Sequence, residues 1–259
     1  MPSWDSQQYL RFAQERTQPS IDLTARIAID PPARIVDLGC GPGNSTAVVA
    51  QRWPSSAVTG VDTSAAMLAT ARKDFPTREW IQHDITAWAA ATPPGSWPLV
   101  FSNAAFQWVP DHSTLLPRLF DAVAPGGALA FQVPHTLEMP HHRLIHEVAN
   151  SATWRSRFLQ PPVSWHVESA GFYYDALASR AARLDLWFTD YIHVLDGPAG
   201  IVEWYRGTGL RPYLDLLPDA AARETYLRDY LTALTPLYPR QADGRVLMPF
   251  RRLFVIAYR

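Results

Sequence analysis

A glycine-rich loop is the part of this sequence whose residue types most directly indicate ligand binding. Gly39, Gly41 and Gly43 follow the apolar segment Arg34–Leu38. Glycine has no Cβ, so the backbone at these positions can turn sharply and approach a ligand closely. Position 44 is Asn44, which breaks the dinucleotide fingerprint G-x-G-x-x-G, and no lysine follows as in a P-loop. The loop predicts a binding turn of another kind, with a purely structural turn as the alternative.

Three further side chains could contact the same ligand. Asp62 follows the apolar segment Ala57–Val61, and a carboxylate there can accept from both hydroxyls of a ribose. Asp84 follows Arg78–His83 and can accept from an adenine amino group, while Met67 could pack against the adenine face. For each aspartate the alternative role is helix capping. Because the carboxyl ends of parallel strands share one edge of a sheet, we expect all these groups to lie together.

The elements that must position these residues alternate through the first half of the chain. Apolar runs predict strands, and helical spacing predicts helices between them. The predicted strands are Arg34–Leu38, Ala57–Val61, Arg78–His83, Leu99–Ser102 and Ala128–Val133, and the helices are Ser45–Trp53, Ala65–Phe75 and His112–Ala124. Such alternation is typical of parallel βαβ units with helices on both faces. Residues 31–134 are therefore predicted to form a doubly wound α/β core that binds a cofactor.

The rest of the chain is predicted to be mostly helical. Residues 1–30 have helical spacing that we expect Pro19 to interrupt. Later elements are the strands Arg183–Val194 and Leu253–Tyr258 and helices in His142–Phe158, Ile201–Tyr205 and Ala220–Leu234. We expect residues 135–182 and 197–251 to form a helical cover over the active site rather than a second core, which makes 1–259 one domain.

Composition excludes several classes of function. The net charge of -1 lacks the basic excess of a nucleic-acid binder, and a single cysteine excludes a disulfide scaffold. No apolar run is long enough to span a bilayer, and the polar N-terminus does not resemble a secretory signal. We therefore expect a cytoplasmic protein without nucleic-acid or membrane partners. Of 23 basic residues only Lys73 is lysine, and arginine suits two-pronged recognition of carboxylates.

Histidine and cysteine do not predict a metal site or a catalytic thiol. His142 and His146 are four residues apart, as on a metal-binding helix face, and His141 adjoins them. No acidic residue accompanies them at the spacing of an H-E-x-x-H site, so we expect no metal. Cys40 lies in the glycine loop without a basic neighbour in sequence, which argues against thiolate chemistry.

The segment Val36–Asn44 resembles the first motif of the class I S-adenosylmethionine-dependent methyltransferases, and the resemblance extends over residues 34–134. It implies a Rossmann-like, seven-stranded, mostly parallel sheet whose last strand is antiparallel. It also implies S-adenosyl-L-methionine as cofactor and S-adenosyl-L-homocysteine as product. The residues that it assigns to the cofactor are Asp37, Gly39, Gly41, Gly43 and Asn44 for the methionyl end, Asp62 for the ribose, Met67, Asp84 and Ile85 for the adenine, and Asn103 and Ala104 near the sulfonium.

A narrower resemblance covers almost the whole chain. The motifs are similar to those of the trans-aconitate 2-methyltransferases, which convert one carboxylate of trans-aconitate to a monomethyl ester. They are Trp4, Tyr9-Leu10, Phe12-Ala13 and Glu15-Arg16, then Gly41–Thr46, Gln107–His112, Tyr173–Asp175, Thr208–Pro212 and Arg252–Phe254. Several of these motifs lie in the predicted cover, where members of the superfamily usually differ, so they are evidence about the identity of the substrate.

The implied chemistry needs little acid–base help, because a carboxylate is already ionised at neutral pH. We expect catalysis by positioning and desolvation, with Trp108 and His112 as candidates. Candidates for binding a small polycarboxylate are Arg211, Trp108, Tyr173, Tyr174, Arg206 and Arg252. The alternative for each arginine is a surface ion pair, and for each aromatic residue ordinary core packing.

Three other functions stay open at this point. The same fold could methylate a different free carboxylate, such as an acyl-carrier-bound malonyl group. A nicotinamide-dependent dehydrogenase is a second alternative, against which Asn44 argues. A third is a module that binds the cofactor without transferring its methyl group.

Overall fold

The protein is described here by a computed structural model, which covers residues 13–159, 162 and 165–259. The motif residues Trp4, Tyr9, Leu10 and Phe12 lie outside the described residues. Among the residues covered, no helix combines the length and apolar character that crossing a bilayer requires.

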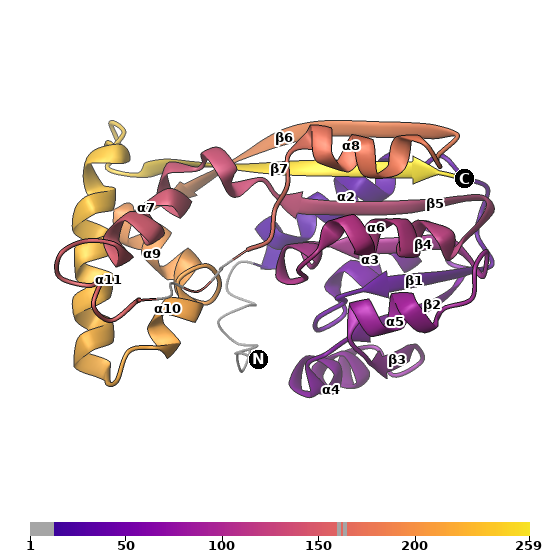
Figure 1. Cartoon of the computed structure of the whole chain (residues 1–259), viewed down its shortest axis with the longest axis horizontal. Coiled ribbons are helices and arrows are strands. Elements are labelled where there is room, and N and C mark those ends of the chain that lie inside the picture. Colours follow the sequence, from indigo (N-terminus) through magenta and orange to yellow (C-terminus); the bar gives the residue numbers. More distant parts are fainter. Residues whose placement is uncertain (1–12, 160–161, 163–164) are drawn as a thin grey trace. The chain divides into compact units, whose positions relative to one another are not determined.

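The described residues form a seven-stranded sheet in the order β3-β2-β1-β4-β5-β7-β6 (Figure 1). The strands are β1 (Arg34–Leu38), β2 (Ala57–Asp62), β3 (Glu79–Gln82), β4 (Trp97–Asn103), β5 (Val123–Pro134), β6 (Arg183–Leu195) and β7 (Val246–Tyr258). Strands β1 to β5 pair in parallel, and β7 is antiparallel to β5. The predicted fold class, a mostly parallel sheet with an antiparallel last strand, is confirmed.

Helices cover both faces of this sheet. Helix α2 (Ala13–Arg26) packs on α3 (Asn44–Arg52), while α6 (His112–Asp121) contacts both α5 (Ile85–Ala91) and α8 (Ala170–Ala178). Figure 1 places the first pair behind the sheet and the other three helices in front of it. Helix α4 (Ala65–Asp74) packs against β2 and β3. This arrangement leaves the carboxyl ends of the parallel strands to carry the loops that precede α3, α4, α5 and α6.

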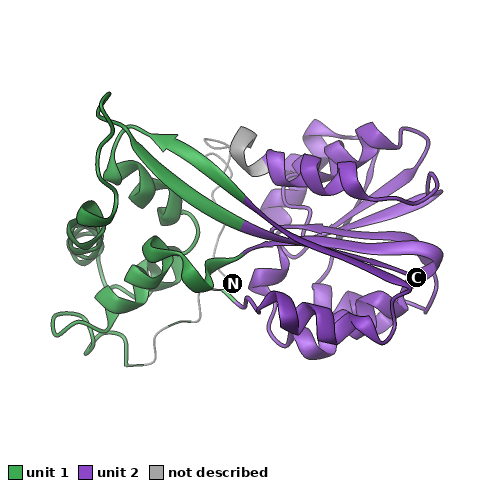
Figure 2. Cartoon of the chain, turned by 90° about the horizontal axis from the view of Figure 1, so that it is seen from above, with its two compact units in different colours: residues 1–9, 135–165, 190–251 green, residues 10–134, 166–189, 252–259 purple. Residues whose placement is uncertain are grey.

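The chain divides into two compact units (Figure 2). Unit 2 comprises the described part of Leu10–Pro134 with His166–Thr189 and Arg252–Arg259, and unit 1 the described part of His135–Trp165 with Asp190–Arg251. The described part of unit 1 begins at His135, the predicted start of the cover, whereas α8, expected in the cover, groups with unit 2. The single-domain organisation stays a prediction.

Unit 1 has a buried aromatic interior of its own. Its helices are α7 (Pro140–Ala149), α9 (Pro198–Arg206), α10 (Arg211–Asp215) and α11 (Ala220–Leu234). The fully buried Tyr226 and Tyr230 of α11 donate to the carbonyl oxygens of Ile145 (3.0 Å) and His141 (2.7 Å) in α7. A tyrosine can fill the interior with its ring and pair its hydroxyl there, so these two bonds fix α11 against α7.

Some elements differ from those expected. Pro19 lies inside α2 and does not end it, because the buried Leu23 and Ile27 hold the helix on the core despite the missing amide donor. The helix expected over His142–Phe158 ends at Ala149, and β7 begins at Val246 rather than Leu253. Helices α5 and α8 were not predicted from the sequence, since both are short and their burial depends on packing against α6.

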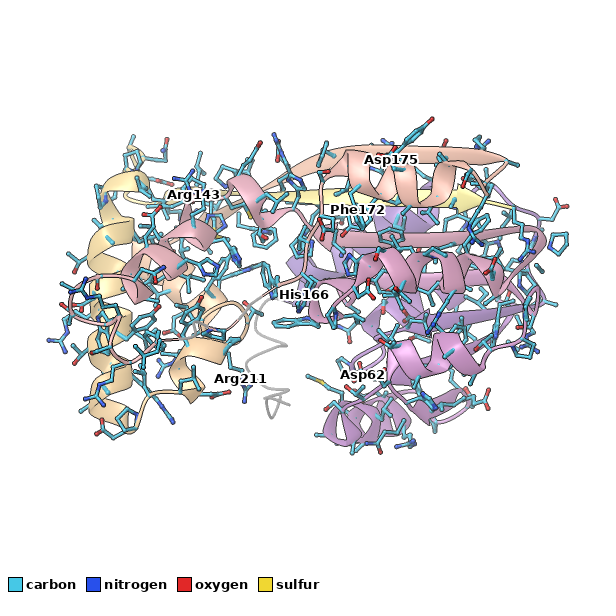
Figure 3. The ribbon with its side chains drawn as sticks, viewed as in Figure 1. Asp62, Arg143, His166, Phe172, Asp175 and Arg211 are labelled. Atoms are coloured by element: carbon cyan, nitrogen blue, oxygen red, sulfur yellow. The ribbon has the colours of Figure 1, made fainter. Side chains whose placement is uncertain are left out.

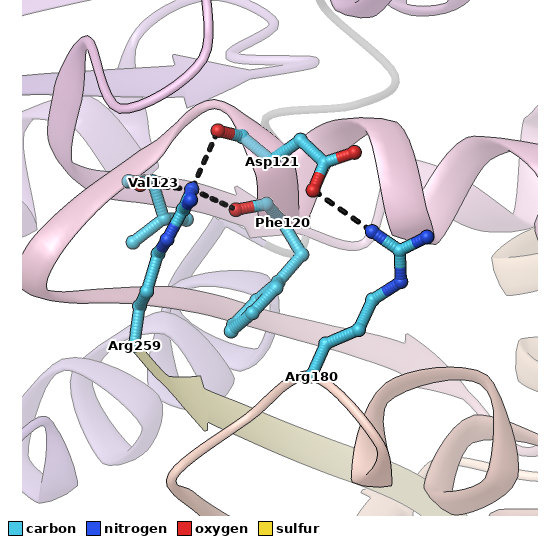
Figure 4. Close-up of polar contacts among 5 residues, drawn as sticks. All are labelled: Phe120, Asp121, Val123, Arg180 and Arg259. Carbon is cyan, nitrogen blue, oxygen red and sulfur yellow. Dashed lines mark hydrogen bonds and ion pairs between the residues drawn. The ribbon is translucent and has the colours of Figure 1, made fainter.

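Two arginines, Arg180 and Arg259, contact the C-terminal end of α6 within unit 2 (Figure 4). Arg259 Nη1 donates to the carbonyl oxygens of Phe120 (3.4 Å), Asp121 (2.7 Å) and Val123 (2.7 Å). A cation at a helix C-terminus adds charge-assisted hydrogen bonds to the carbonyl oxygens there, and it interacts favourably with the helix dipole. Arg180 instead makes an exposed ion pair with the Asp121 carboxylate at 2.8 Å.

Replacing these two arginines should therefore have unequal effects on stability. Arg259→Ala should lower the free energy of unfolding by about 1–3 kcal/mol, because it removes the charge-assisted hydrogen bonds to three carbonyl oxygens. Arg180→Ala removes a solvent-screened pair and should lower it by less than about 1 kcal/mol. Urea denaturation of both variants at neutral pH measures the difference. Equal losses would contradict the proposed importance of the carbonyl contacts.

Candidate functional site

The glycine loop after β1 is shaped by contacts that exclude side chains. Gly39 and Gly43 have φ values of +73° and +96°. A Cβ on Gly39 would lie 2.1 Å from the Cβ of Ala105, and one on Gly43 would lie 2.8 Å from the indole of Trp80. The Gly39 amide donates to Val61 O at 2.7 Å. Both glycines are therefore required by backbone conformation and by close packing at the carboxyl edge of the sheet.

Asp62, at the end of β2, holds this loop (Figure 3). Its Oδ2 accepts from the Gly41 amide at 2.9 Å and its Oδ1 from the Ser64 amide at 2.8 Å. Burial raises the pKa of the carboxyl, and the backbone hydrogen bonds oppose that rise. Each carboxylate oxygen can accept a second hydrogen bond, so the group can hold the loop and a ligand hydroxyl together.

Asp37 is a fully buried carboxyl beneath the loop. Its Oδ2 accepts from the hydroxyls of Ser45 (2.7 Å) and Thr46 (2.6 Å), which belong to the first turn of α3. Its Oδ1 accepts no hydrogen bond from the described residues. Burial is the main cause that raises the pKa of Asp37 to about 6. A buried carboxylate oxygen without a donor fits a ligand that brings a cationic or hydrogen-bonding group.

The other predicted cofactor residues after β2 and β3 differ in exposure. Asp84 is exposed and caps α5, accepting from the Ala87 amide at 3.0 Å, so the capping role is observed. The His83 amide donates to Asp62 O at 3.0 Å, which brings these two strand ends together. Ile85 and Met67 are 6% and 4% exposed. Contact of Met67 with an adenine ring stays a prediction.

Asn103 and Ala104 stand at the end of β4, as expected. The Asn103 Oδ1 accepts from Gln132 Nε2 at 2.9 Å, and the Ala104 amide donates to Gln132 O at 3.1 Å. Ala104 has φ +53°, a left-handed conformation that is unfavourable for a residue with a Cβ. Gln132 was missed by the sequence analysis. The sequence feature that could have identified Gln132 is its polar side chain within the otherwise apolar run of β5, because a buried amide side chain needs hydrogen-bond partners.

Among the substrate candidates of unit 2, exposure varies widely. Tyr174 is 53% exposed, whereas Tyr173 and His112 are buried and hydrogen-bonded to each other at 3.0 Å. Trp108, at the end of the 3₁₀ turn Phe106–Trp108, is partly exposed. Arg252 lies in β7 opposite Pro134 of β5 and is 5% exposed. His112 is hydrogen-bonded to Tyr173 and to Phe106 O of the turn that carries Trp108, and contact of these residues with substrate stays a prediction.

The candidates of unit 1 lie on α9 and α10. Arg206 pairs with Glu203 (3.4 Å) and Glu224 (3.1 Å), which is the surface ion-pair alternative. Arg211 begins α10, and its Nε lies 3.6 Å from the Asp215 carboxylate. The Arg211 side chain is 18% exposed, compared with 41% for Arg206.

The histidines of α7 and the single cysteine have structural surroundings. Burial lowers the pKa of His141 and of His142 to about 3, so both rings are neutral at pH 7. In the part of the chain that the structure describes, no three His, Cys, Asp or Glu side chains are arranged to hold a metal. Cys40 is buried, which raises the pKa of its thiol and disfavours the thiolate.

The sequence has close full-length relatives. Residues 35–127 match a family model described as a methyltransferase domain. The chain is 49% identical to the trans-aconitate 2-methyltransferase of Azoarcus sp. (strain BH72), over 100% of both chains. It is 47% identical to the trans-aconitate 2-methyltransferase of Rhodopseudomonas palustris (strain BisB18), over 99% of each.

Solved structures of low identity share the fold. The YcgJ protein of Bacillus subtilis aligns with a TM-score of 0.61 at 13% identity, over 93% of this chain and 98% of that one. A Haemonchus contortus phosphoethanolamine N-methyltransferase, solved with S-adenosyl-L-methionine, aligns with a TM-score of 0.54 at 18% identity, over 93% of this chain and 52% of that one.

The raised pKa of Asp37 makes a testable contribution to stability. A carboxyl whose pKa is higher in the folded than in the unfolded protein stabilises the fold at low pH, and this advantage is lost as pH rises. Between pH 4 and 7, wild type should lose about 2–2.5 kcal/mol relative to Asp37→Asn, since the pKa rises from 3.8 to about 6.

Urea denaturation of both proteins across this range measures the loss, and the comparison cancels the titration of histidines common to both. Ser45→Ala should move the midpoint to higher pH, because it removes a donor to the ionised form. A wild-type curve parallel to that of Asp37→Asn would contradict the assignment.

Proposed function

The chain belongs to the trans-aconitate 2-methyltransferase family of class I S-adenosylmethionine-dependent methyltransferases, and we propose that it esterifies one carboxylate of trans-aconitate to the monomethyl ester. The observation that carries the proposal is 49% identity along the entire length of a relative bearing that name. Identity of this extent includes the helical segments outside the cofactor-binding core, where a substrate preference would reside.

The residues of the glycine loop fit S-adenosyl-L-methionine. A Cβ on Gly41 would meet no protein atom within 4 Å, so the loop is open there to a methionyl group. The Asp37 Oδ1, which accepts no hydrogen bond from the described residues, suits the positive end of that group. Asp62 and Asp84 lie at neighbouring strand ends for the ribose and the adenine. When bound, this cofactor supplies a methyl group on a sulfonium, which is already electrophilic.

The reaction then needs positioning more than proton transfer. A substrate carboxylate oxygen forms the new O–CH₃ bond while the S–CH₃ bond breaks, and the sulfonium leaves as the neutral thioether of S-adenosyl-L-homocysteine. One negative and one positive charge are neutralised together, so no proton is exchanged. His112 fits this scheme because both its ring nitrogens are within hydrogen-bond distance of protein groups, which leaves it unsuited to act as a base.

For the remaining carboxylates we propose arginine and aromatic donors. Arg211 is the first choice, because its side chain is largely buried and lies in a family motif. Arg206 is less suited, since two glutamates already compensate its charge. Trp108, Tyr174 and Arg252 complete the proposed set, whereas Tyr173 is fully buried and hydrogen-bonded to His112.

The proposed partner is a small polycarboxylate in the cytoplasm, and nucleic acid is not expected, because the net charge is -1. An acyl-carrier-bound malonyl substrate is not favoured, since the relatives described above are named for trans-aconitate.

The direct experiment is incubation with methyl-labelled S-adenosyl-L-methionine and a panel of acids. Trans-aconitate should give a base-labile labelled ester, faster than cis-aconitate, citrate or a malonyl thioester. Labelling of the malonyl thioester alone would replace the proposed substrate. No ester from any acid would overturn the proposed activity.

Arg211→Ala should weaken binding of the acid selectively. Loss of a charge-assisted contact worth about 2–3 kcal/mol should raise the KM for trans-aconitate about 30- to 150-fold, with the KM for the cofactor changed less than about 2-fold. Arg143→Ala, which removes an exposed arginine of α7, is the matched control (Figure 3). Equal effects on both KM values would count against contact between Arg211 and the acid.

A further inference from the structure

A short turn follows β4 and carries Trp108. Ala104 adopts a left-handed conformation, and the 3₁₀ turn Phe106–Trp108 comes directly after it. Gln107 Nε2 donates to Ala104 O at 2.6 Å, which closes the turn on itself. Short 3₁₀ turns have poor hydrogen-bond geometry, and a left-handed alanine adds strain. Such a turn depends on neighbouring elements to keep its conformation.

His112, the first residue of α6, supports this turn from one side. Its Nε2 lies 2.9 Å from Phe106 O, and its Nδ1 lies 3.0 Å from the Tyr173 hydroxyl. A carbonyl oxygen can only accept, so Nε2 carries the hydrogen and Nδ1 has the lone pair. Tyr173 therefore donates its hydroxyl hydrogen to Nδ1. The imidazole is neutral and joins the turn to α8.

The segment before α8 is hydrogen-bonded both to Tyr173 and to the turn that carries Trp108. The Tyr173 hydroxyl accepts from the Glu168 amide at 3.3 Å, and the His166 amide donates to Gln107 O at 2.7 Å. Figure 3 labels His166, and Phe172 on α8, in this part of unit 2. Two independent contacts therefore fasten the turn to residues about 60 positions later in the chain.

The hydrogen bond between His112 and Tyr173 is buried. His112 is 3% exposed and Tyr173 is fully buried. The Tyr173 ring lies 5.4 Å from that of Phe131 in β5, which in turn lies 5.1 Å from that of Phe106. Burial lowers the pKa of His112 and raises that of Tyr173, so both stay uncharged. Hydrogen bonds between buried neutral groups have well-defined geometry, and breaking one leaves an unpaired polar atom.

We propose that His112 and Tyr173 are positioning residues, which fix the Trp108 turn at the carboxyl end of β4 for methyl transfer without touching the reacting atoms. The proposal rests on the proposed function and assigns Tyr173 a role other than substrate contact. Because direct displacement depends on alignment, a displacement of about 1 Å in a supporting turn can lower the rate about 100-fold.

The test is Tyr173→Phe, which keeps the ring and removes the hydroxyl. The kcat for trans-aconitate should fall about 10-fold or more and the KM for the acid should rise, while the Kd of S-adenosyl-L-methionine stays within about 2-fold. His112→Gln keeps a donor for Phe106 O and should retain more activity than His112→Ala. Unchanged kcat and acid KM in Tyr173→Phe would overturn the proposal.

Tyr258→Phe is the matched control. The Tyr258 hydroxyl also bridges two backbone groups in unit 2, the Ala28 amide (3.3 Å) and Arg26 O (3.4 Å), and its side chain is buried. It should lose stability comparably but keep wild-type kinetics. Equal kinetic losses in both variants would reduce the role of Tyr173 to general stability and overturn the proposal.

A spectroscopic measurement separates this inference from the proposed function. The ¹⁵N shifts of His112 should report a neutral ring protonated at Nε2, and Tyr173→Phe should shift the Nδ1 resonance. If wild type forms no ester but these shifts are observed, the proposed activity fails while the hydrogen-bonded connection stands. A ring protonated at Nδ1 would overturn the connection itself.

Discussion

The backbone of Gly39 and the side chain of Ala105 approach so closely that a Cβ at position 39 would lie 2.1 Å from that of Ala105. This contact joins the loop after β1, which we propose holds the cofactor, to the turn after β4, which carries Trp108. The remaining features of the site depend on it. Asp62 holds the loop through the Gly41 amide, and His112 holds the turn through Phe106 O. A larger residue at 39 would force apart the loop after β1 and the turn after β4, whose roles in cofactor binding and positioning we propose.

Several buried polar side chains lie near the contact between Gly39 and Ala105. Their hydrogen bonds fix the orientation of neighbouring groups, and the proposed reaction requires no proton transfer from them. Gln132 orients Asn103, and Asp37 accepts from the first turn of α3. His112 and Tyr173 bind each other. This agrees with a reaction in which an ionised carboxylate displaces a sulfonium, because neither reactant needs to gain or lose a proton. Buried hydrogen bonds of defined direction suit such chemistry, since the rate depends on alignment.

The two units follow different packing principles. Unit 2 contains a mostly parallel sheet with helices on both faces, and the loops after its parallel strands share one sheet edge. Unit 1 is held by tyrosines whose hydroxyls pair with main-chain oxygens of α7. The relative described above is similar to this chain over the residues of both units, so the family resemblance includes the helical unit as well as the sheet. The arginine excess noted in the sequence has several roles, from the α6 terminus at Arg259 to the surface pairs of Arg206.

Local pattern alone predicted the order and approximate positions of the strands β1 to β5, the glycine loop and the acidic residues at the strand ends, although β5 begins at Val123 instead of Ala128. Alternation of apolar runs with helical spacing is a property of neighbouring residues, and the glycines of the loop are visible in the sequence, although the packing of Gly39 against Ala105 is not. Tertiary structure decided the rest. Pro19 remains within a helix because Leu23 is buried, and Tyr173 faces His112 across 61 residues of sequence. Burial and hydrogen bonding between distant segments depend on how the elements pack, which no local pattern records.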